Sequence, residues 1–182
     1  MTKNKKIKNR GLTIVYIGKG KGKTTAAVGL AVRARGWKKR VLFLQFIKEA
    51  KWPSGERAML KRLGVHIWVM GQGFVKILND QKPFTVHKQA ASRALKKAQE
   101  AVRSKKYDVV VLDEAISAVE EKLLSQTSIA DLITKKQPKI TLVLTGHTAY
   151  PMIVKKADLV TDMTKIKHPF DQGVLAQKGI DF

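Results

Sequence analysis

Short runs of apolar residues recur along the chain and alternate with longer segments of helical periodicity. Several runs are rich in Val, Ile and Leu and are almost continuously apolar, which is typical of parallel strands covered on both faces. The predicted strands are residues 12–17, 40–46, 65–70, 108–112, 139–146 and 159–163. The predicted helices are residues 23–35, 56–63, 85–104 and 117–134, with a short helix near Met152. This alternation predicts an α/β fold with a mostly parallel sheet of about six strands and helices on both faces.

The two ends of the chain lack this periodicity. Residues 1–10 are mostly polar and basic, which predicts a flexible basic arm, and an irregular tail is expected from about residue 165. Between them, 182 residues with 44% hydrophobic content suit one domain with an ample core. No run of about 18 apolar residues and no signal-peptide core is present, so we expect a cytoplasmic protein without a membrane segment.

A glycine-rich segment lies where the first predicted strand meets an alanine-rich helix. It reads Gly18, Lys19, Gly20, Lys21, Gly22, Lys23, Thr24 and Thr25. Glycines let successive N–H groups point at phosphate oxygens, and the helix that follows adds its positive N-terminal end. Lys23 would contact the phosphates, and the Thr24 hydroxyl would bind Mg²⁺.

The spacing of this segment is one residue shorter than in the usual P-loop motif, G-x-x-x-x-G-K-[ST]. The alternative is a glycine-rich turn in a lysine-rich chain. The coincidence of strand, glycines, Lys-Thr-Thr and helix favours a P-loop, and therefore a single P-loop nucleotide-binding domain over residues 11–182. We also expect the carboxyl end of residues 40–46 to lie beside this loop.

Two carboxylates, Asp113 and Glu114, come directly after the apolar strand 108–112. In a P-loop protein this position is typical of the second metal-binding strand, so both are predicted metal ligands together with Thr24. The alternative is a helix N-terminus, which favours acidic residues for electrostatic reasons. The two interpretations are compatible.

The amino-acid composition excludes several kinds of chemistry and leaves several classes of binding partner possible. The chain has no Cys, which excludes disulfides, thiolate metal sites, iron–sulfur clusters and a cysteine nucleophile. Its net charge is +22, and residues 1–60 hold 16 basic and 2 acidic side chains. Such a charge attracts polyanions, namely nucleic acid, polyphosphate or an acidic protein, although a solvated lysine-rich surface explains it equally well.

Several motifs together resemble the P-loop type of corrinoid adenosyltransferase over residues 11–182. They are the short glycine loop of residues 18–25, Gln45-Phe46-Ile47-Lys48, Gly71-x-Gly73-Phe74, Leu112-Asp113-Glu114, residues 157–163, Lys167-His168-Pro169-Phe170 and the ending at residues 176–182. The short loop and the two C-terminal motifs are the specific ones.

The resemblance implies a RecA-like fold, usually a homodimer, that transfers the 5′-deoxyadenosyl group of ATP to cobalt(I) of a corrinoid and releases triphosphate. It implies that the loop and Lys23 hold the triphosphate, that Thr24 and Glu114 bind Mg²⁺ or Mn²⁺ with Asp113 nearby, and that Arg33 contacts the nucleotide or packs in its helix. It further implies that Gly73, Phe74 and Lys76 lie at the corrinoid. Since the chain has no redox group, the electron would come from a separate protein, and the resemblance points to an acidic flavodoxin-like reductant.

The chain departs from the family pattern at Lys19, Lys76 and His147, where Asn or Asp, Trp and Arg are common, and its basic arm is short. The missing aromatic at Lys76 concerns the corrinoid rather than ATP. Two other classes therefore remain open, a nucleic-acid-linked P-loop ATPase and a non-catalytic nucleotide-binding protein, with nucleic acid as a non-specific partner in the first. The products of ATP distinguish the three classes: triphosphate is expected from the transferase, ADP and phosphate from the ATPase, and neither from the binding protein.

Overall fold

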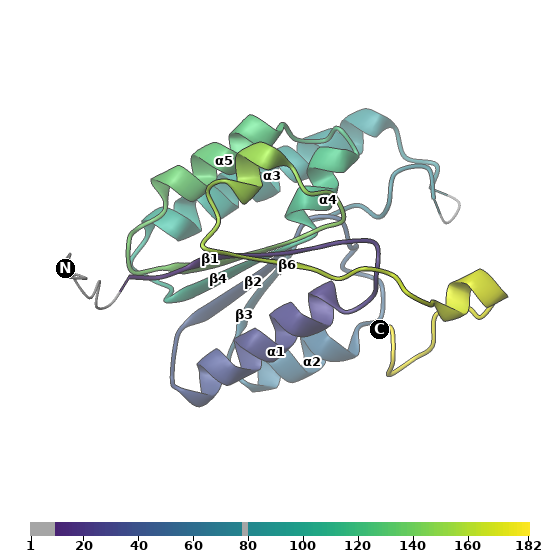
Figure 1. The fold of residues 1–182 in the computed structure, drawn as a ribbon, viewed down its shortest axis with the longest axis horizontal. Helices are drawn as coiled ribbons and strands as arrows, with labels where there is room; N and C mark the ends of the chain where they lie inside the picture. Colours follow the sequence, from purple (N-terminus) through teal and green to yellow (C-terminus); the bar gives the residue numbers. More distant parts are fainter. Residues whose placement is uncertain (1–9, 78–79) are drawn as a thin grey trace, which may run out of the picture.

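The computed structural model describes residues 10–77 and 80–182. Its centre is a six-stranded sheet in which all neighbouring strands run parallel, in the order β3-β2-β4-β5-β1-β6 (Figure 1). The strands are β1 (Thr13–Ile17), β2 (Val41–Gln45), β3 (His66–Val69), β4 (Val109–Asp113), β5 (Thr141–Thr145) and β6 (Leu159–Asp162). The helices are α1 (Lys23–Gly36), α2 (Gly55–Arg62), α3 (Phe84–Arg103), α4 (Ala115–Glu120), α5 (Gln126–Lys135), α6 (Pro151–Val154) and the 3-10 helix η1 (Pro169–Gln172). The predicted α/β fold is confirmed, and it is consistent with a P-loop NTPase.

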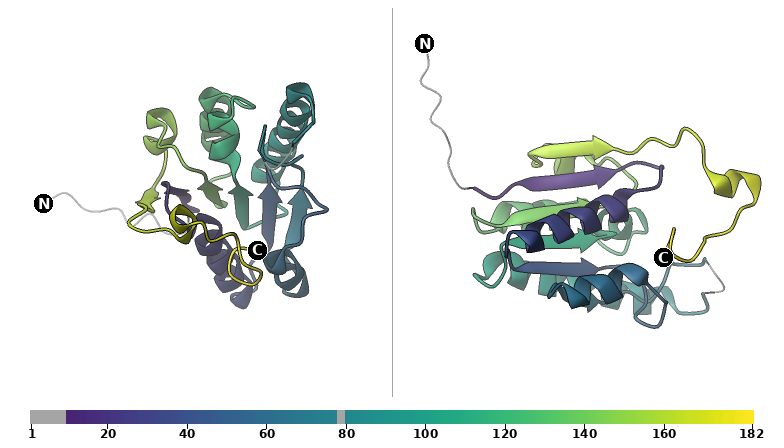
Figure 2. Two further views of the ribbon diagram at one scale, coloured as in Figure 1. Left: turned by 90° about the vertical axis from the view of Figure 1, so that its right-hand side faces the viewer. Right: turned by 90° about the horizontal axis from the view of Figure 1, so that it is seen from below.

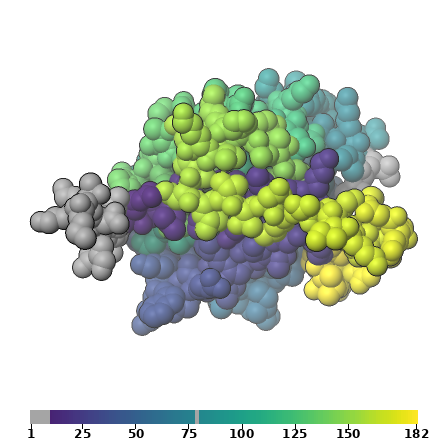
Figure 3. All heavy atoms as spheres, in the orientation of Figure 1, coloured from purple at the N-terminus to yellow at the C-terminus, as the bar shows by residue number. Residues whose placement is uncertain are grey.

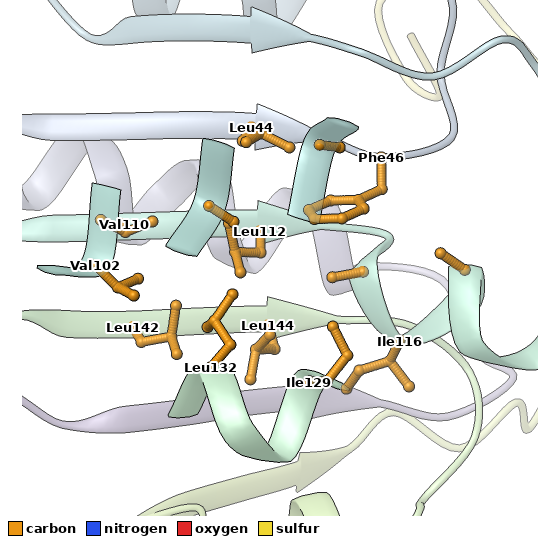
Figure 4. Close-up of a cluster of buried hydrophobic side chains, with 14 of the residues drawn as sticks. Leu44, Phe46, Val102, Val110, Leu112, Ile116, Ile129, Leu132, Leu142 and Leu144 are labelled. Atoms are coloured by element: carbon orange, nitrogen blue, oxygen red, sulfur yellow. The ribbon is translucent and has the colours of Figure 1, made fainter. Parts of the chain in front are cut away.

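Helices cover both faces of the sheet. α1 and α2 lie on one face, whereas α3, α4 and α5 lie on the other (Figures 1 and 2). Because side chains alternate between the two faces of a strand, two buried clusters form. The larger one, which includes Leu112, Leu132 and Leu144, lies between the sheet and α3 to α5 (Figure 4). The smaller one surrounds Phe43 and Val111 under α1 and α2. Two buried faces explain why these strands are continuously apolar in sequence.

The helix predicted over residues 117–134 is wrong in one respect, since the structure has two helices there. α4 ends at Glu120, and Lys122 adopts a φ of 57°, a left-handed conformation through which no α-helix continues. Ser125 then caps α5 by accepting a hydrogen bond from the N–H of Ser128 at 3.1 Å. Apolar side chains on either side of the break pack on the same face of the sheet, so their periodicity hides the break.

The carboxyl end of β2 lies near the glycine loop, as expected, although β2 is not a neighbour of β1: Gln45 donates to Asp113, which also accepts a hydrogen bond from Thr24. β2 pairs with β3 and β4, and two strands separate it from β1. The chain beyond β2 also reaches the loop, because Lys48 lines the same cavity as Lys23.

The C-terminal segment leaves the sheet after β6 and curves back to the ends of the strands (Figure 2). As predicted, it is mostly irregular, apart from η1. It forms one end of the molecule in Figure 3. Of the predicted basic arm, residues 1–9 lie outside the described residues. Within residues 10–77 and 80–182, no helix combines the length and the apolar character needed to cross a bilayer.

Arg40 and Asp108 join the beginnings of β2 and β4. The Arg40 guanidinium donates to both carboxylate oxygens of Asp108, at 3.1 and 2.9 Å, and the Arg40 backbone N–H donates at 2.8 Å. The hydrogen bonds from the Arg40 side chain are the main reason why the pKa of Asp108 falls from 3.8 to about 2. A carboxylate with a depressed pKa stabilises the fold above its unfolded pKa, and this contribution is lost as the pH falls through the folded pKa.

We therefore expect Asp108→Asn to lower the free energy of unfolding by about 1 kcal/mol at pH 7, after allowance for the exposure of the pair. The deficit should shrink between pH 4 and about pH 2, the window set by the two pKa values. Urea denaturation across this range measures it. Asp131→Asn is the matched control, because Asp131 pairs with Lys135 at 3.8 Å on an open helix surface. An equal loss in both variants, or a deficit that does not change with pH, would contradict the assignment.

Candidate nucleotide and corrinoid site

The glycine loop of residues 18–22 is pressed against the chain that follows β6. Gly18 and Gly22 have φ values of 107° and 115°, which glycine adopts readily. The N–H of Gly20 donates to the carbonyl oxygen of Met163 at 2.6 Å, and a Cβ on Gly20 would lie 2.5 Å from that oxygen. The loop therefore needs glycine both for its conformation and for its close contact with residue 163.

Lys23, the first residue of α1, points back into this loop. Its Nζ donates to the carbonyl oxygens of Gly18 and Gly20, each at 2.7 Å, and the residue is only 8% exposed. Burial lowers the pKa of Lys23, and the nearby carboxylate of Glu114 opposes this effect. The ammonium group thus lies at the N-terminus of a helix, inside a curl of backbone, where an anion is favoured.

Asp113 ends β4 and is fully buried under the loop. Its Oδ1 accepts hydrogen bonds from the hydroxyls of Thr24 and Thr145, both at 2.9 Å, and its Oδ2 accepts one from Nε2 of Gln45 at 3.2 Å. Gln45 is its register partner on β2. The structure therefore brings together Thr24 and Asp113, 89 residues apart in sequence, as the sequence predicts.

Glu114 turns out of the sheet toward the loop. Its φ of 60° is left-handed, its N–H donates to the Thr145 hydroxyl at 2.8 Å, and its carboxylate accepts a hydrogen bond from Ser117. Burial, followed by the neighbouring charge of Asp113, raises the pKa of Glu114. A buried acid with a raised pKa is stabilised as the anion by a cation, so the position suits a metal ligand.

The oxygen atoms here fit Mg²⁺. Within the described residues, no group of three or more His, Cys, Asp and Glu could hold a metal alone. Mg²⁺ usually binds through one or two carboxylates, a hydroxyl and substrate phosphates. Thr24, Asp113 and Glu114 are the residues here that could supply the protein part of that set.

A cavity of about 400 Å³ opens beside the loop. Six of the predicted residues line it: Lys21, Gly22, Lys23, Thr24, Thr25 and Glu114. Gly18, Lys19 and Gly20 belong to the loop but not to the lining, and Lys19 is exposed. Arg33 is also exposed and lies roughly 15 Å from Lys23 along the axis of α1, so the structure does not bring it to the cavity.

Other cavity residues were not identified as candidates from the sequence. Lys48 and Glu56 form an ion pair at 3.1 Å on one wall. His147, identified only as a departure from the family pattern, lies on another wall. Residues 179–182 close a third side, where Lys21 contacts Asp181 and donates to the carbonyl oxygen of Ile180 at 3.0 Å. The C-terminal motif was the only sequence signal for this last contact.

The loop after β3 borders a second cavity, of about 260 Å³. Gly73 and Phe74 line it, whereas Lys76 does not; Lys76 has a φ of 56°, and its N–H donates to Asp80 at 3.1 Å. Trp52, which no sequence pattern singled out, also lines this cavity, and its ring stacks on Phe74 with centroids 5.9 Å apart. A second aromatic ring therefore lies beside Phe74, contributed by the segment between β2 and α2.

Comparison with known proteins agrees with this arrangement. A family model described as "ATP:corrinoid adenosyltransferase BtuR/CobO/CobP" matches residues 9–182. The chain is 37% identical over 173 residues to a "Corrinoid adenosyltransferase" of Escherichia coli (strain K12), covering 95% of this chain and 86% of the relative. It has the same identity and coverage with "Corrinoid adenosyltransferase CobA" of Salmonella typhimurium (strain LT2). It is 35% identical over 181 residues to a "Corrinoid adenosyltransferase" of Sinorhizobium sp, covering 97% of this chain and 83% of the relative. The chain therefore belongs to the ATP:corrinoid adenosyltransferase family.

Proposed function

We propose that this protein transfers the 5′-deoxyadenosyl group of ATP to the cobalt(I) of a corrinoid and releases triphosphate. The observation that carries the proposal is the contact of Thr24 with Asp113 beneath a shortened glycine loop, in a chain that matches this family from residue 9 to 182. Incubation with ATP, Mg²⁺ and a chemically reduced corrinoid tests it. Loss of the cobalt(I) absorption band together with release of triphosphate is the expected result.

The reaction needs no protein nucleophile, because cobalt(I) of the substrate provides the electron pair. A cobalt–carbon bond forms at C5′ of ATP while the bond from C5′ to the triphosphate oxygen breaks, and its electron pair leaves on triphosphate. The protein's contribution is to position the two substrates and to stabilise the leaving charge. Lys23 and the backbone N–H groups of residues 21–24 would provide that charge stabilisation.

Mg²⁺ would be held by Thr24 and Glu114 with Asp113 behind them, and Mn²⁺ suits the same oxygen atoms. When bound, the metal neutralises phosphate charge. Asp113 orients the Thr24 hydroxyl through their hydrogen bond, and burial of Glu114 strengthens its preference for a neighbouring cation.

We place the corrinoid against the second cavity, beside Gly73, Phe74 and Trp52. Lys76 is exposed and outside the lining, so a lysine there would be less effective than an aromatic in displacing a lower axial ligand from cobalt. We expect a base-free cobinamide to react faster than complete cobalamin under the same reductant, and Lys76→Trp to narrow the gap. Adenosylation rates with both corrinoids measure this. Equal rates in the unaltered protein would contradict the role of Lys76.

An acidic flavodoxin-like protein is the proposed electron donor, since the chain has no Cys and a charge of +22. Attraction between opposite charges should raise the encounter rate by about 10-fold to 10³-fold at low salt. At saturating ATP, adenosylation should fall steeply from about 0.05 to about 0.5 M salt with flavodoxin and only slightly with a small chemical reductant. Equal salt dependence with flavodoxin and with the chemical reductant would mean that the positive charge of the protein serves another partner.

Two further proposals concern assembly and location. We propose a homodimer, supported by exposed apolar side chains on and after β6, of which Ile166 is 97% and Leu175 77% exposed. Light scattering measures the mass. Since ATP is a cytoplasmic substrate, we propose that the reaction takes place in the cytoplasm.

Non-specific nucleic-acid binding is a second candidate function, favoured by the charge at the amino ends of the strands. Because all strands are parallel, the segments before β2, β4 and β5 meet at one edge of the sheet. Their exposed lysines are Lys38, Lys39, Lys105, Lys106 and Lys139. Trp37 is 80% exposed beside them, as a base-stacking residue would be. Stimulation of ADP release by single-stranded DNA would support this candidate; triphosphate as the product supports the transferase.

A further inference from the structure

Residues 46–54, the segment between β2 and α2, separate the two cavities. Lys48 lines the nucleotide cavity, where it pairs with Glu56, whereas Glu49 and Trp52 line the second cavity. One short segment, here called the partition, therefore borders both cavities. Any contact that positions the partition acts on both of them.

Arg57, in the first turn of α2, holds the partition in place. Its Nη1 donates to the carbonyl oxygens of Glu49, Ala50 and Trp52 at 2.9, 3.3 and 3.1 Å. Its Nε donates to Oε1 of Gln45 at 2.6 Å. A planar guanidinium can make these bonds in different directions at once, and a lysine ammonium lacks that fixed fork.

Gln45 extends these contacts to the metal-binding strand. Gln45 and Asp113 are fully buried, and the amide of Gln45 donates to Oδ2 of Asp113 while Thr24 donates to Oδ1. A continuous series of hydrogen bonds thus runs from Thr24 through Asp113, Gln45 and Arg57 to the carbonyl of Trp52.

Trp52 connects the series to the loop after β3. Its ring stacks on Phe74, with an angle of 27° between the planes. Gly73 has a φ of 99°, and a Cβ there would lie 3.4 Å from the Trp52 ring. The N–H of Gly73 also donates to the carbonyl of Ile47 in the partition at 2.8 Å. A shift of the partition would therefore move the aromatic pair.

Stability alone does not explain the arginine. Among the described residues, Nη2 of Arg57 is a buried side-chain nitrogen without a hydrogen-bond partner. A buried unpaired donor opposes folding. Burial also lowers the pKa of Arg57, against the opposing charge of Glu56.

We propose that Arg57 is a positioning residue that couples the nucleotide and metal site to the Trp52–Phe74 pair. Binding of ATP with Mg²⁺ changes the hydrogen bonds of Asp113. Gln45 and Arg57 then shift with Asp113, and the partition that Arg57 holds moves the Trp52 ring. The importance of this coupling for adenosylation rests on the proposed placement of the corrinoid at the second cavity.

Trp52 fluorescence tests the coupling without any corrinoid. The chain has three tryptophans, so the double variant Trp37→Phe/Trp68→Phe leaves Trp52 as the only one. We expect ATP with MgCl₂ to change its emission, and Arg57→Met to abolish that change. ATP affinity should stay within about threefold, because Arg57 does not line the nucleotide cavity. In the protein that keeps all three tryptophans, Arg57→Met should raise the KM for the corrinoid about tenfold.

Arg62→Met is the matched control, since Arg62 lies on the same helix, is exposed, and among the described residues its side chain donates a hydrogen bond only to the Met59 sulfur, at 3.9 Å. Its response should equal that of the double variant. A persistent response in Arg57→Met, or no response in the double variant itself, overturns the coupling.

If Arg57→Met fails to fold by circular dichroism, Gln45→Met decides. Gln45→Met removes the link to Asp113 and leaves the carbonyl contacts of Arg57. A lost response supports the coupling, and a retained one overturns it.

A further measurement separates the coupling from the proposed placement of the corrinoid. Reduced corrinoid should quench Trp52 emission, and its failure to do so would refute the placement at the second cavity rather than the coupling.

Discussion

Lys23→Ala is expected to lower the rate of triphosphate release by at least about 10²-fold, the scale for removing one preorganised electrostatic contact. The triphosphate leaving group gathers several negative charges as the bond to C5′ breaks. Lys23 is buried in the loop and held at 2.7 Å by two backbone carbonyls, so its charge needs little rearrangement to meet the phosphates. Quantifying triphosphate and adenosylated corrinoid under saturating substrates measures the effect.

Lys19→Ala is the matched control, because Lys19 belongs to the same loop but is exposed and outside the cavity lining. Its loss should change the rate by less than about threefold, as for a solvent-screened charge. Equal losses in the two variants would mean that the general positive field of the loop matters rather than the buried ammonium. ADP as the main product would refute the transferase mechanism itself.

Gly18→Ala should destabilise the protein by about 2–4 kcal/mol and abolish ATP binding. The φ of 107° at Gly18 is disfavoured for alanine, and a Cβ would lie 2.5 Å from the carbonyl oxygen of Met163 and even closer to the Asp162 carboxylate. The strand and the loop would have to separate, which removes the curl that holds Lys23. Thermal unfolding should show a Tm lower by roughly 5–15 °C for a chain of this size.

Gly29→Ala, in the helix that follows the loop, is the comparison. Gly29 lies in the middle of α1, and nothing lies within 4 Å of a Cβ built there. The substitution should stabilise the protein by about 0.5–1 kcal/mol, because alanine favours a helix. A similar loss of stability in both variants would show that glycine content, rather than the packing of the loop against Met163, determines the result.

The sequence was informative where the local pattern also determines the tertiary position. Buried parallel strands are continuously apolar, and the carboxyl ends of such strands meet at one edge, which is why the contact of Thr24 with Asp113 could be anticipated. The break at Lys122 could not, because a left-handed residue between two apolar helical segments leaves no sequence signature.

Trp52 and residues 179–182 were missed for a different reason. Each contacts its partner through the path of a loop, and loop paths depend on packing against the finished domain. Lys76, with a φ of 56°, lies outside the lining of the second cavity, and the role at the corrinoid that the family resemblance implied for it stays a proposal.

The position of β1 has a consequence for how the chain folds. β1 carries the glycine loop, yet it lies between β5 and β6, and the cavity beside the loop is closed by residues 179–182. The nucleotide site therefore depends on contacts between segments more than 120 residues apart, as in the register of Thr13 with Leu142. Such contacts carry a large loop-closure entropy and form late. On the ribosome, the glycine loop would therefore emerge well before β5 and β6, the strands that flank β1.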